Sequence, residues 1–225
     1  PTYQGVTAQH ANYVAALREA GLKVDVLPPL EDFPDSTFVE DPALTFPEGA
    51  ILLRPGAPSR AAEPEHLRDA LARHFAKVIE IGPDEPVDGG DVLVTPEIVF
   101  IGLSKRTSLP GAKALQRKLR ELGRASRISE TPPGVLHFKT VSSLVAENAI
   151  LCTTAAASFF DGFKVLIAPE DAAANAIRVN DTVFVGAEYP RTIAMLRAEG
   201  LTVTPIPVSE IAKLDAGLSC MSLRW

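Results

Sequence analysis

The sequence lacks several features that would by themselves decide its class. Its 225 residues include only two cysteines, which is too few for a disulfide framework, and we expect both thiols to be reduced. No apolar run approaches the ~20 residues that span a bilayer, and no signal peptide is visible. The net charge is −6 and no lysine- or arginine-rich block occurs. These absences predict a cytoplasmic protein with neither a membrane nor a nucleic-acid partner.

The composition that is present is typical of a globular protein. Hydrophobic residues make up 46% of the sequence and charged residues 22%. The length allows a substantial core, in one domain or in two small ones. The chain begins PTYQG without a methionine, so we expect a segment upstream of it to be missing.

Four segments read as pairs of extended apolar stretches joined by a short turn. Pro-Glu, Glu-Asn or Asn-Asp stands at the turn, and Val, Ile, Phe and Thr dominate the arms. A helical pattern and then a short apolar strand follow three of these hairpins, whereas the third hairpin has only a short connection. The hairpins are predicted at 37–56, 91–104, 136–154 and 175–187, the helices at 63–75, 111–122 and 188–199, and the closing strands at 77–81, 125–129, 164–168 and 201–206.

The two ends of the chain suggest an incomplete fifth copy of this unit. It would consist of a helix at 10–21 and strands at 22–28 and 218–225, with one further strand before residue 1. If the first and last strands pair, a ring closes and leaves no open sheet edge. The repeat therefore predicts an α/β fold, as a closed ring or, alternatively, as an open mixed sheet.

Acidic residues gather where the predicted strands begin. Asp35, Glu40 and Asp41 lie in EDFPDSTFVEDPA, and Asp88 and Asp91 lie in VDGGDVL. Any one of them alone reads as a surface carboxylate, but so many on two hairpins repel one another unless a cation lies among them. A divalent metal ion would serve, although the spacing is not that of an EF-hand, and so would a guanidinium or ammonium ligand.

Arginines occupy similar positions. Arg54 and Arg60 flank a Pro-Gly turn, and Lys105 and Arg106 directly follow a predicted strand. The planar guanidinium binds a carboxylate through two parallel hydrogen bonds. These residues are therefore candidates for binding a carboxylate, with solvated loop charges as the alternative.

One histidine and one cysteine stand apart from the others of their kind. His137 lies in a predicted apolar strand, where it is either a buried structural residue or a general acid–base. Cys152 reads as a core thiol, whereas Cys220 follows Gly217, which would leave the approach to its sulfur open. A cysteine and a histidine that meet in the fold form a nucleophile–base pair.

Six segments, taken in order, closely resemble the dimethylarginine dimethylaminohydrolases of the guanidino-group-modifying (pentein) superfamily. They are FVEDPA, LLRPGAPSR, DGGDVL, FIGLSKRT, LHFKT and LDAGLSCMS, and the match runs from about residue 9 to the end. The resemblance implies one catalytic domain over 1–225 with the pentein fold. That fold is a five-bladed α/β propeller of strand–strand–helix–strand units around a central channel, and its leading strand would be missing here.

The resemblance also implies a role for each candidate residue. Cys220 matches the nucleophile, His137 the acid–base histidine and Asp88 the acid that orients it. Asp41, with Glu40 beside it, matches the carboxylate that binds the guanidinium. The amino-acid end of the substrate would be bound by Arg60 and Arg106 at the carboxylate, and by Asp35 and the backbone carbonyl of Leu214 at the ammonium.

The implied activity is the hydrolysis of asymmetric dimethylarginine and monomethylarginine. The products would be citrulline and dimethylamine or methylamine, formed through a covalent thiouronium on the cysteine without a metal or cofactor. Arginine deiminase is an alternative, but it usually has an acid two residues after the histidine, where this chain has Lys139. A non-catalytic protein that binds arginine-like ligands is the other alternative, although it would not need a nucleophile. A homodimer is left open.

Overall fold

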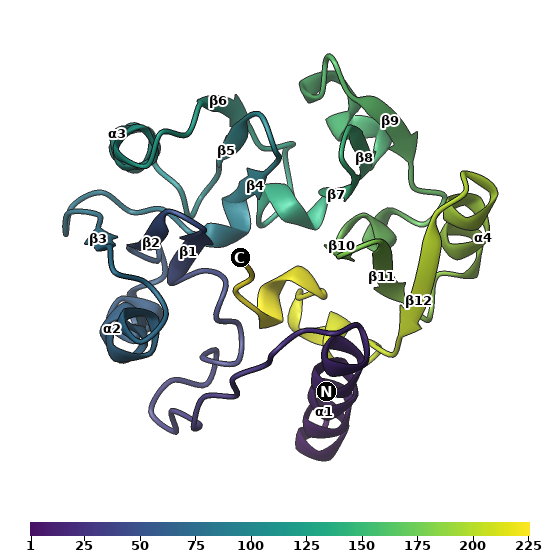
Figure 1. The fold of residues 1–225 in the computed structure, drawn as a ribbon, viewed down its shortest axis with the longest axis horizontal. Helices are drawn as coiled ribbons and strands as arrows, with labels where there is room; N and C mark the ends of the chain where they lie inside the picture. The colour runs from purple at the N-terminus through teal and green to yellow at the C-terminus, as the bar shows by residue number, and fades with distance from the viewer. The chain divides into compact units, whose positions relative to one another are not determined.

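The computed structural model describes residues 1–225 and contains four separate three-stranded sheets (Figure 1). The chain divides into two compact units: unit 1 comprises residues 1–26 and 139–219, and unit 2 comprises residues 27–138 and 220–225. Each unit contains two of the sheets. The single domain expected over 1–225 therefore stays a prediction.

Unit 2 consists of two copies of the predicted repeat. In each copy two antiparallel strands form a hairpin, and the third strand pairs in parallel with the second. A parallel neighbour requires a crossover connection, and the helix supplies it. The first copy comprises β1 (Ala43–Phe46), β2 (Gly49–Leu52), α2 (Glu63–Ala72) and β3 (Val78–Glu80); the second comprises β4 (Val92–Val94), β5 (Val99–Leu103), α3 (Leu109–Glu121) and β6 (Ser126–Glu130).

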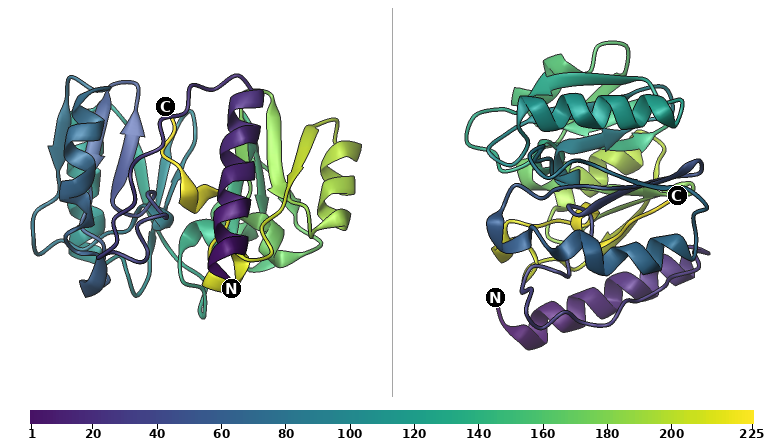
Figure 2. Two further views of the ribbon diagram at one scale, coloured as in Figure 1. Left: turned by 90° about the horizontal axis from the view of Figure 1, so that it is seen from below. Right: turned by 90° about the vertical axis from the view of Figure 1, so that its left-hand side faces the viewer.

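Unit 1 contains two further copies with the same strand order. The short connection predicted in the third copy is confirmed, because a six-residue 3-10 helix, η4 (Thr154–Phe159), stands where the other copies have an α-helix. Helix α1 (Tyr3–Glu19) contacts β12, and Figure 2 shows its full length. The remaining elements are β7 (Ser142–Ala146), β8 (Ala149–Cys152), β9 (Lys164–Ile167), β10 (Ile177–Val179), β11 (Thr182–Gly186), α4 (Pro190–Ala198) and β12 (Thr202–Ile206).

The spacing of apolar residues in the predicted helices is confirmed by their burial. Leu67, Leu71 and Phe75 are all buried, and they share one core cluster with residues of β1 and β2. Helix α4 ends before Gly200, whose φ of +83° is the left-handed conformation that glycine adopts at helix ends. None of the helices combines the length and the apolar character needed to cross a membrane.

The first sheet of unit 2 is buried on both faces. Ala50 and Leu52 pack in the cluster of α2, whereas Ile51 packs with Leu115 and Leu119 of α3. Neighbouring residues of a strand point to opposite faces, so both sets of side chains are apolar. This explains why these strands read as continuous apolar runs.

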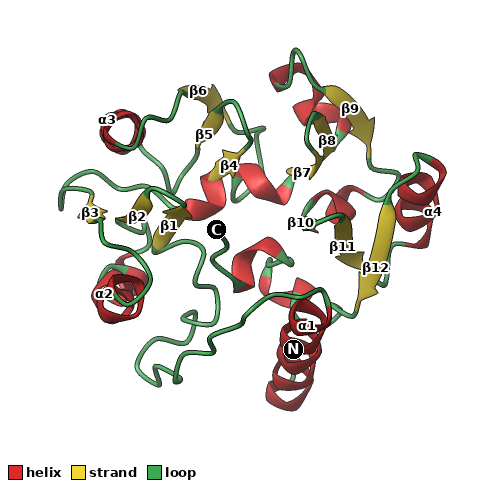
Figure 3. Ribbon diagram, viewed as in Figure 1, coloured by secondary structure: helices red, strands yellow, loops and turns green.

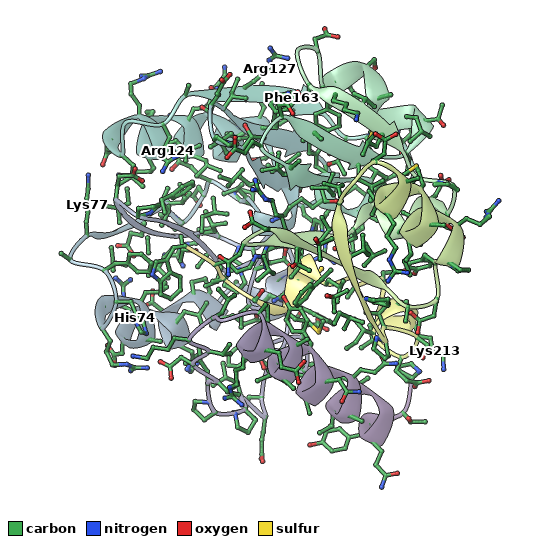
Figure 4. All side chains as sticks on the ribbon, turned by 45° about the vertical axis from the view of Figure 1, so that its right-hand side comes forward. His74, Lys77, Arg124, Arg127, Phe163 and Lys213 are labelled. Atoms are coloured by element: carbon green, nitrogen blue, oxygen red, sulfur yellow. The ribbon has the colours of Figure 1, made fainter.

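Two arginine side chains, Arg124 and Arg127, lie over buried aromatic rings, and both arginines are labelled in Figure 4. The guanidinium carbon of Arg124 lies 5.4 Å from the centre of the Phe46 ring, and its Nη2 lies 2.9 Å from the carboxylate of Glu48. Arg127 lies over Phe100 in the same way, at 5.6 Å. In both pairs the guanidinium group itself lies over the face of an aromatic ring, which attracts its positive charge.

The strands predicted for the fifth copy are wrong. Residues 22–28 and 218–225 contain no strand, and Figure 3 shows the end of the chain as a helical turn and loop. The tail turns as the 3-10 helix η7 (Ser219–Met221), which interrupts the extended backbone that a strand requires. The helix predicted at 10–21 is present but begins earlier, at Tyr3.

Candidate active site

The candidate residues, apart from Leu214, all lie in unit 2, and several of them lie near the start or the end of a strand. Asp41 precedes β1 by two residues, and Asp88 immediately precedes the 3-10 helix η2 (Gly89–Asp91), which leads into β4. Arg106 follows β5. The strand predicted around His137 is wrong, because this residue precedes a 3-10 helix and the next strand begins only at Ser142.

His137 and Asp88 form a buried pair. Nε2 of His137 lies 2.9 Å from Oδ2 of Asp88 and 3.9 Å from Oδ1 of Asp41. Asp88 is fully buried, and its other oxygen accepts the N–H of Gly56 at 2.6 Å. Burial by itself lowers the pKa of His137, but the hydrogen bond to Asp88 and the charges of Asp41, Asp91 and Asp88 outweigh it, so the pKa is raised. The imidazole is therefore able to hold a proton near neutral pH.

The two glycines of η2 allow this close approach. A Cβ on Gly89 would lie 2.0 Å from the carbonyl oxygen of Glu40, and one on Gly90 would lie 2.7 Å from Cγ and Nδ1 of His137. The N–H of Gly90 also donates to Oδ1 of Asp41 at 2.9 Å. The backbone of η2 thus packs directly against the imidazole and the Asp41 carboxylate.

Arg60, the predicted partner of the substrate carboxylate, forms an internal ion-pair network, and its contact with a substrate stays a prediction. Its Nη1 lies 2.5 Å from Oδ2 of Asp41, and its Nη2 lies 2.7 Å from Oε2 of Glu63. Nη2 also donates to the carbonyl oxygens of Phe38 and Asp35, and Nε donates to Glu63. Buried acids and carbonyl groups therefore already bind all three nitrogens of this side chain, which is 7% exposed.

This network fixes the charge and the orientation of Arg60. Burial lowers its pKa, but the bonds and charges of Glu63 and Asp41 outweigh burial and raise it. Sequence reasoning missed Glu63, although its position three residues after Arg60 is the spacing of a local ion pair. Because Nη1 carries two N–H groups and makes one bond, it keeps one donor for a ligand.

The C-terminal residues place the backbone of Cys220 beside Glu40. Cys220 is half-buried and forms no disulfide, and its carbonyl oxygen accepts the N–H of Glu40 at 3.2 Å. Further along, the hydroxyl of Thr45 donates to the carbonyl oxygen of Arg224 at 2.9 Å, and Nη2 of Arg224 lies 4.0 Å from Oε1 of Glu40. The tail therefore runs beside the segment that carries Glu40 and Asp41.

The expectation about Cys152 and the expectation about Gly217 have different outcomes. Cys152 is buried in β8, and burial raises its pKa to about 11, so it is the core thiol that we predicted. The reason given for Gly217 is wrong: a Cβ there would lie 2.3 Å from the side chain of Asn175, so this glycine makes room for the asparagine. Asn175 in turn accepts the N–H of Ser219, within the same unit.

The residues expected at the amino-acid end of the substrate are less enclosed. Arg106 is half-buried, and a Cβ on Gly56 would lie 2.3 Å from its carbonyl oxygen, so its loop packs against the turn before Arg60. Asp35 is exposed. Leu214, in the 3-10 helix η6 (Ala212–Leu214), belongs to unit 1, and its contact with the substrate stays a prediction.

Asp41, Asp88 and His137 form a cluster that suits a cation. Each offers one ligand atom, and these atoms lie within 4.8 Å of one another. Such a set of oxygens and nitrogen can hold zinc when the imidazole is deprotonated, and its two carboxylates can equally accept the N–H groups of a guanidinium. The Arg60 network contains two buried carboxylates, those of Asp41 and Glu63, but only one guanidinium group. This excess of negative charge favours binding of a further cation here.

Comparisons with known proteins agree with this chemistry. A family model described as arginine deiminase matches residues 26–153. The chain is 37% identical over 233 aligned residues to the dimethylarginine dimethylaminohydrolase of Pseudomonas aeruginosa, covering 100% of this chain and 90% of that protein. It is 30% identical over 217 residues to the enzyme of the same name from Streptomyces coelicolor, covering 94% and 83%.

The fold is also similar to that of a solved structure. The Pseudomonas aeruginosa enzyme, solved as a cysteine-to-serine mutant in complex with citrulline, matches with a TM-score of 0.97 and 36% identity, covering 100% of this chain and 90% of that one. The α/β pentein fold predicted from the sequence is thereby confirmed.

Proposed function

The chain belongs to the dimethylarginine dimethylaminohydrolase family, and we propose that it hydrolyses asymmetric methylarginines to citrulline and dimethylamine or methylamine. The observation that carries this proposal is the buried His137–Asp88 pair beside Asp41. The segment that holds Cys220 runs along Glu40, next to that acid. A nucleophile, an acid–base group and a cation-binding carboxylate are what cleavage of a guanidinium C–N bond requires.

In this proposal the acids bind the guanidinium and prepare the thiol. Asp41, with Glu40 beside it, accepts the N–H groups of the unmethylated nitrogen, and the dimethylated nitrogen then faces His137. A thiolate ~4 Å from the bound cation is stabilised by roughly 4 kcal/mol at an effective dielectric constant near 20. Substrate binding therefore helps to generate the nucleophile from Cys220.

The reaction then runs in two halves. Sγ of Cys220 forms a bond to the guanidinium carbon, and the bond from that carbon to the methylated nitrogen breaks as His137 donates a proton to the leaving amine. In the second half His137 takes a proton from water, whose oxygen attacks the thiouronium carbon. The S–C bond breaks, citrulline leaves, and the proton returns to the thiol. Asp88 orients the imidazole throughout, through the 2.9 Å contact.

The amino-acid end of the substrate needs its own binding groups. We assign Arg106 and the remaining Nη1–H of Arg60 to the carboxylate, because both carry donors that suit a carboxylate oxygen. Asp35 and the carbonyl group of Leu214 are assigned to the ammonium. Asp35 is exposed and its backbone is already tied to Arg60, which places it near the same charge network.

Citrulline formation tests the function directly. Asymmetric dimethylarginine, monomethylarginine, arginine and symmetric dimethylarginine would be compared in parallel with the parent protein and Cys220→Ser. We expect turnover of the first two, and rejection of the symmetric isomer, because one of its methyl groups must face Asp41. Arginine deiminase is the second candidate, since the matching family model describes that enzyme. Preferential turnover of arginine would favour it, and ligand binding without citrulline would favour a binding protein.

We further propose that the enzyme works in the cytoplasm. Neither of its cysteines forms a disulfide, which suits a reducing compartment and a thiol nucleophile. A homodimer stays a prediction, which sedimentation of the intact chain would decide.

A further inference from the structure

Asp91 is a fully buried carboxylate that has no role in the mechanism above. Its Oδ2 accepts hydrogen bonds from the hydroxyl groups of Ser104 and Thr107, both at 2.6 Å. Its Oδ1 accepts the N–H of Phe138 at 2.9 Å. One side chain at the start of β4 thus binds groups from two other segments.

The direction of these hydrogen bonds is fixed by the groups around the two hydroxyls. Oγ of Ser104 accepts the N–H groups of Arg106 at 2.9 Å and of Thr107 at 3.1 Å, so both of its lone pairs are used and its proton points to Asp91. Oγ1 of Thr107 accepts the N–H of Asp88 at 3.1 Å and donates to Asp91. Asp91 therefore has to be an acceptor at both oxygens, which a carboxylate is and an amide is not.

Each branch of this network ends on the backbone of a candidate site residue or its neighbour. The Thr107 branch ends on the N–H of Asp88, and Phe138 directly follows His137. The Ser104 branch ends on the N–H groups of Arg106 and Thr107. The Ser104 and Thr107 hydroxyls, one toward each end of the proposed substrate, thus meet at one carboxylate, and the backbone of Thr107 also joins the two branches.

We propose that Asp91 is a positioning residue for this reaction, which holds the Asp88–His137 pair through Thr107 and Phe138, and Arg106 through Ser104. This inference rests on the proposed function. Its distinctive consequence is that the two branches separate kinetically. Loosening the Thr107 branch affects the chemical step, whereas loosening the Ser104 branch affects binding of the substrate carboxylate.

Four variants test the two branches. In Asp91→Asn an amide N–H group faces the hydroxyl protons of Ser104 and Thr107, so these hydrogen bonds are lost. For asymmetric dimethylarginine we therefore expect kcat to fall and KM to rise, each by about tenfold. Ser104→Ala should raise KM about tenfold with kcat within about twofold of the parent. Thr107→Val should lower kcat about tenfold with little change in KM, and Thr107→Ser, which keeps the hydroxyl, should restore it.

A matched control separates positioning from stability. Thr95 is a buried threonine at the other end of the β4–β5 hairpin, and its hydroxyl donates to the carbonyl oxygen of Ile98 at 2.7 Å. Thr95→Val should be less stable than the parent but keep the parent kcat and KM. The kcat is calculated per active site, and the active sites are counted by titration with a thiol reagent. If Asp91→Asn does not fold, Ser104→Ala and Thr107→Val carry the test. Parental kcat and KM in both, or equal changes in both parameters, would overturn the proposal.

A readout without substrate distinguishes failure of this inference from failure of the proposed function. Absence of citrulline from the parent protein would reject the function alone. The carboxylates of Asp41, Asp88 and Asp91 act on His137, and all three remain in Thr107→Val. NMR titration of the imidazole should show a lower His137 pKa in Thr107→Val and the parent value in Ser104→Ala. An unchanged pKa in Thr107→Val would reject the positioning role.

Discussion

Replacing Gly90 with alanine should impair catalysis by displacing His137. The new Cβ would lie 2.7 Å from Cγ and Nδ1 of the imidazole and 2.8 Å from Oδ1 of Asp41. The φ of Gly90 is not in the left-handed region, so the backbone conformation itself suits alanine. Any effect therefore comes from contact with these two side chains.

The size of the effect follows from the displacement. Ordinary contact begins near 3.4 Å, so the ring has to move by about 0.7 Å if the backbone stays in place. That movement acts on a 2.9 Å contact between Nε2 of His137 and Oδ2 of Asp88. A misplacement of 1 Å can cost about 10²-fold in rate, so we expect kcat to fall about 30- to 100-fold.

Steady-state citrulline formation by Gly90→Ala would be compared with that of Gly82→Ala. In the control the added Cβ meets only the carboxylate end of Glu85, at 2.9 Å, and this flexible side chain can move away. Circular dichroism and thermal unfolding would establish that both variants fold. Because the effect acts through the His137–Asp88 contact, Gly90→Ala should cost little more in an Asp88→Asn background. A folded Gly90→Ala protein with a kcat within threefold of the parent would refute this reasoning.

Three further predictions concern the nucleophile, the histidine and the carboxylate site. Cys220→Ser should form no citrulline while its Tm stays near the parent value, and iodoacetamide should label Cys220 before Cys152, whose pKa burial raises to about 11; faster labelling of Cys152 would contradict the assignment. Folding raises the pKa of His137 above 6.5, so its stabilisation is fully present below about pH 6.5 and is lost as the pH rises through the folded value. Urea titrations would give the free energy of unfolding of the parent and of His137→Asn at each pH, and the difference between the two should shrink as the pH rises over that range. A difference that increases with pH would contradict the predicted direction. Arg106→Ala should lower kcat/KM for asymmetric dimethylarginine about 10- to 100-fold, since a charge-assisted hydrogen bond contributes ~1.5–3 kcal/mol; an equal loss with dimethylagmatine, which lacks the carboxylate, would mean that Arg106 acts elsewhere.

The elements that form from local patterns could be predicted from the sequence. The apolar spacing in 63–75 and 111–122 and the turns between the strands specify the repeat, because α2 covers one face of the first sheet and α3 packs against the other. The strands at 22–28 and 218–225 were wrong because an extended segment becomes a strand only beside a partner, and the tail turns at Ser219–Met221 instead.

The sequence predicted which residues belong to the candidate site, but it did not predict all of the polar contacts that these residues make. Twenty-eight acids offer many candidates for pairing with an arginine, and the sequence alone does not select the distant Asp41 for Arg60, although Glu63 stands at the spacing of a local ion pair. The role of Asp91 is equally hidden, because its partners, Ser104 and Thr107, are ordinary loop residues until the fold brings their hydroxyls to 2.6 Å. Long-range polar contacts of this kind depend on the packed fold and leave no periodic signal.

The central claim is that Cys220 attacks the guanidinium carbon and expels the methylated nitrogen. Acid quench of the enzyme during turnover, digestion and mass spectrometry test it most directly. Because dimethylamine leaves from one substrate and methylamine from the other, asymmetric dimethylarginine and monomethylarginine should give adducts of identical mass, both on the peptide that contains Cys220. Adducts of different mass, an adduct on Cys152, or citrulline formation by Cys220→Ser would contradict the mechanism.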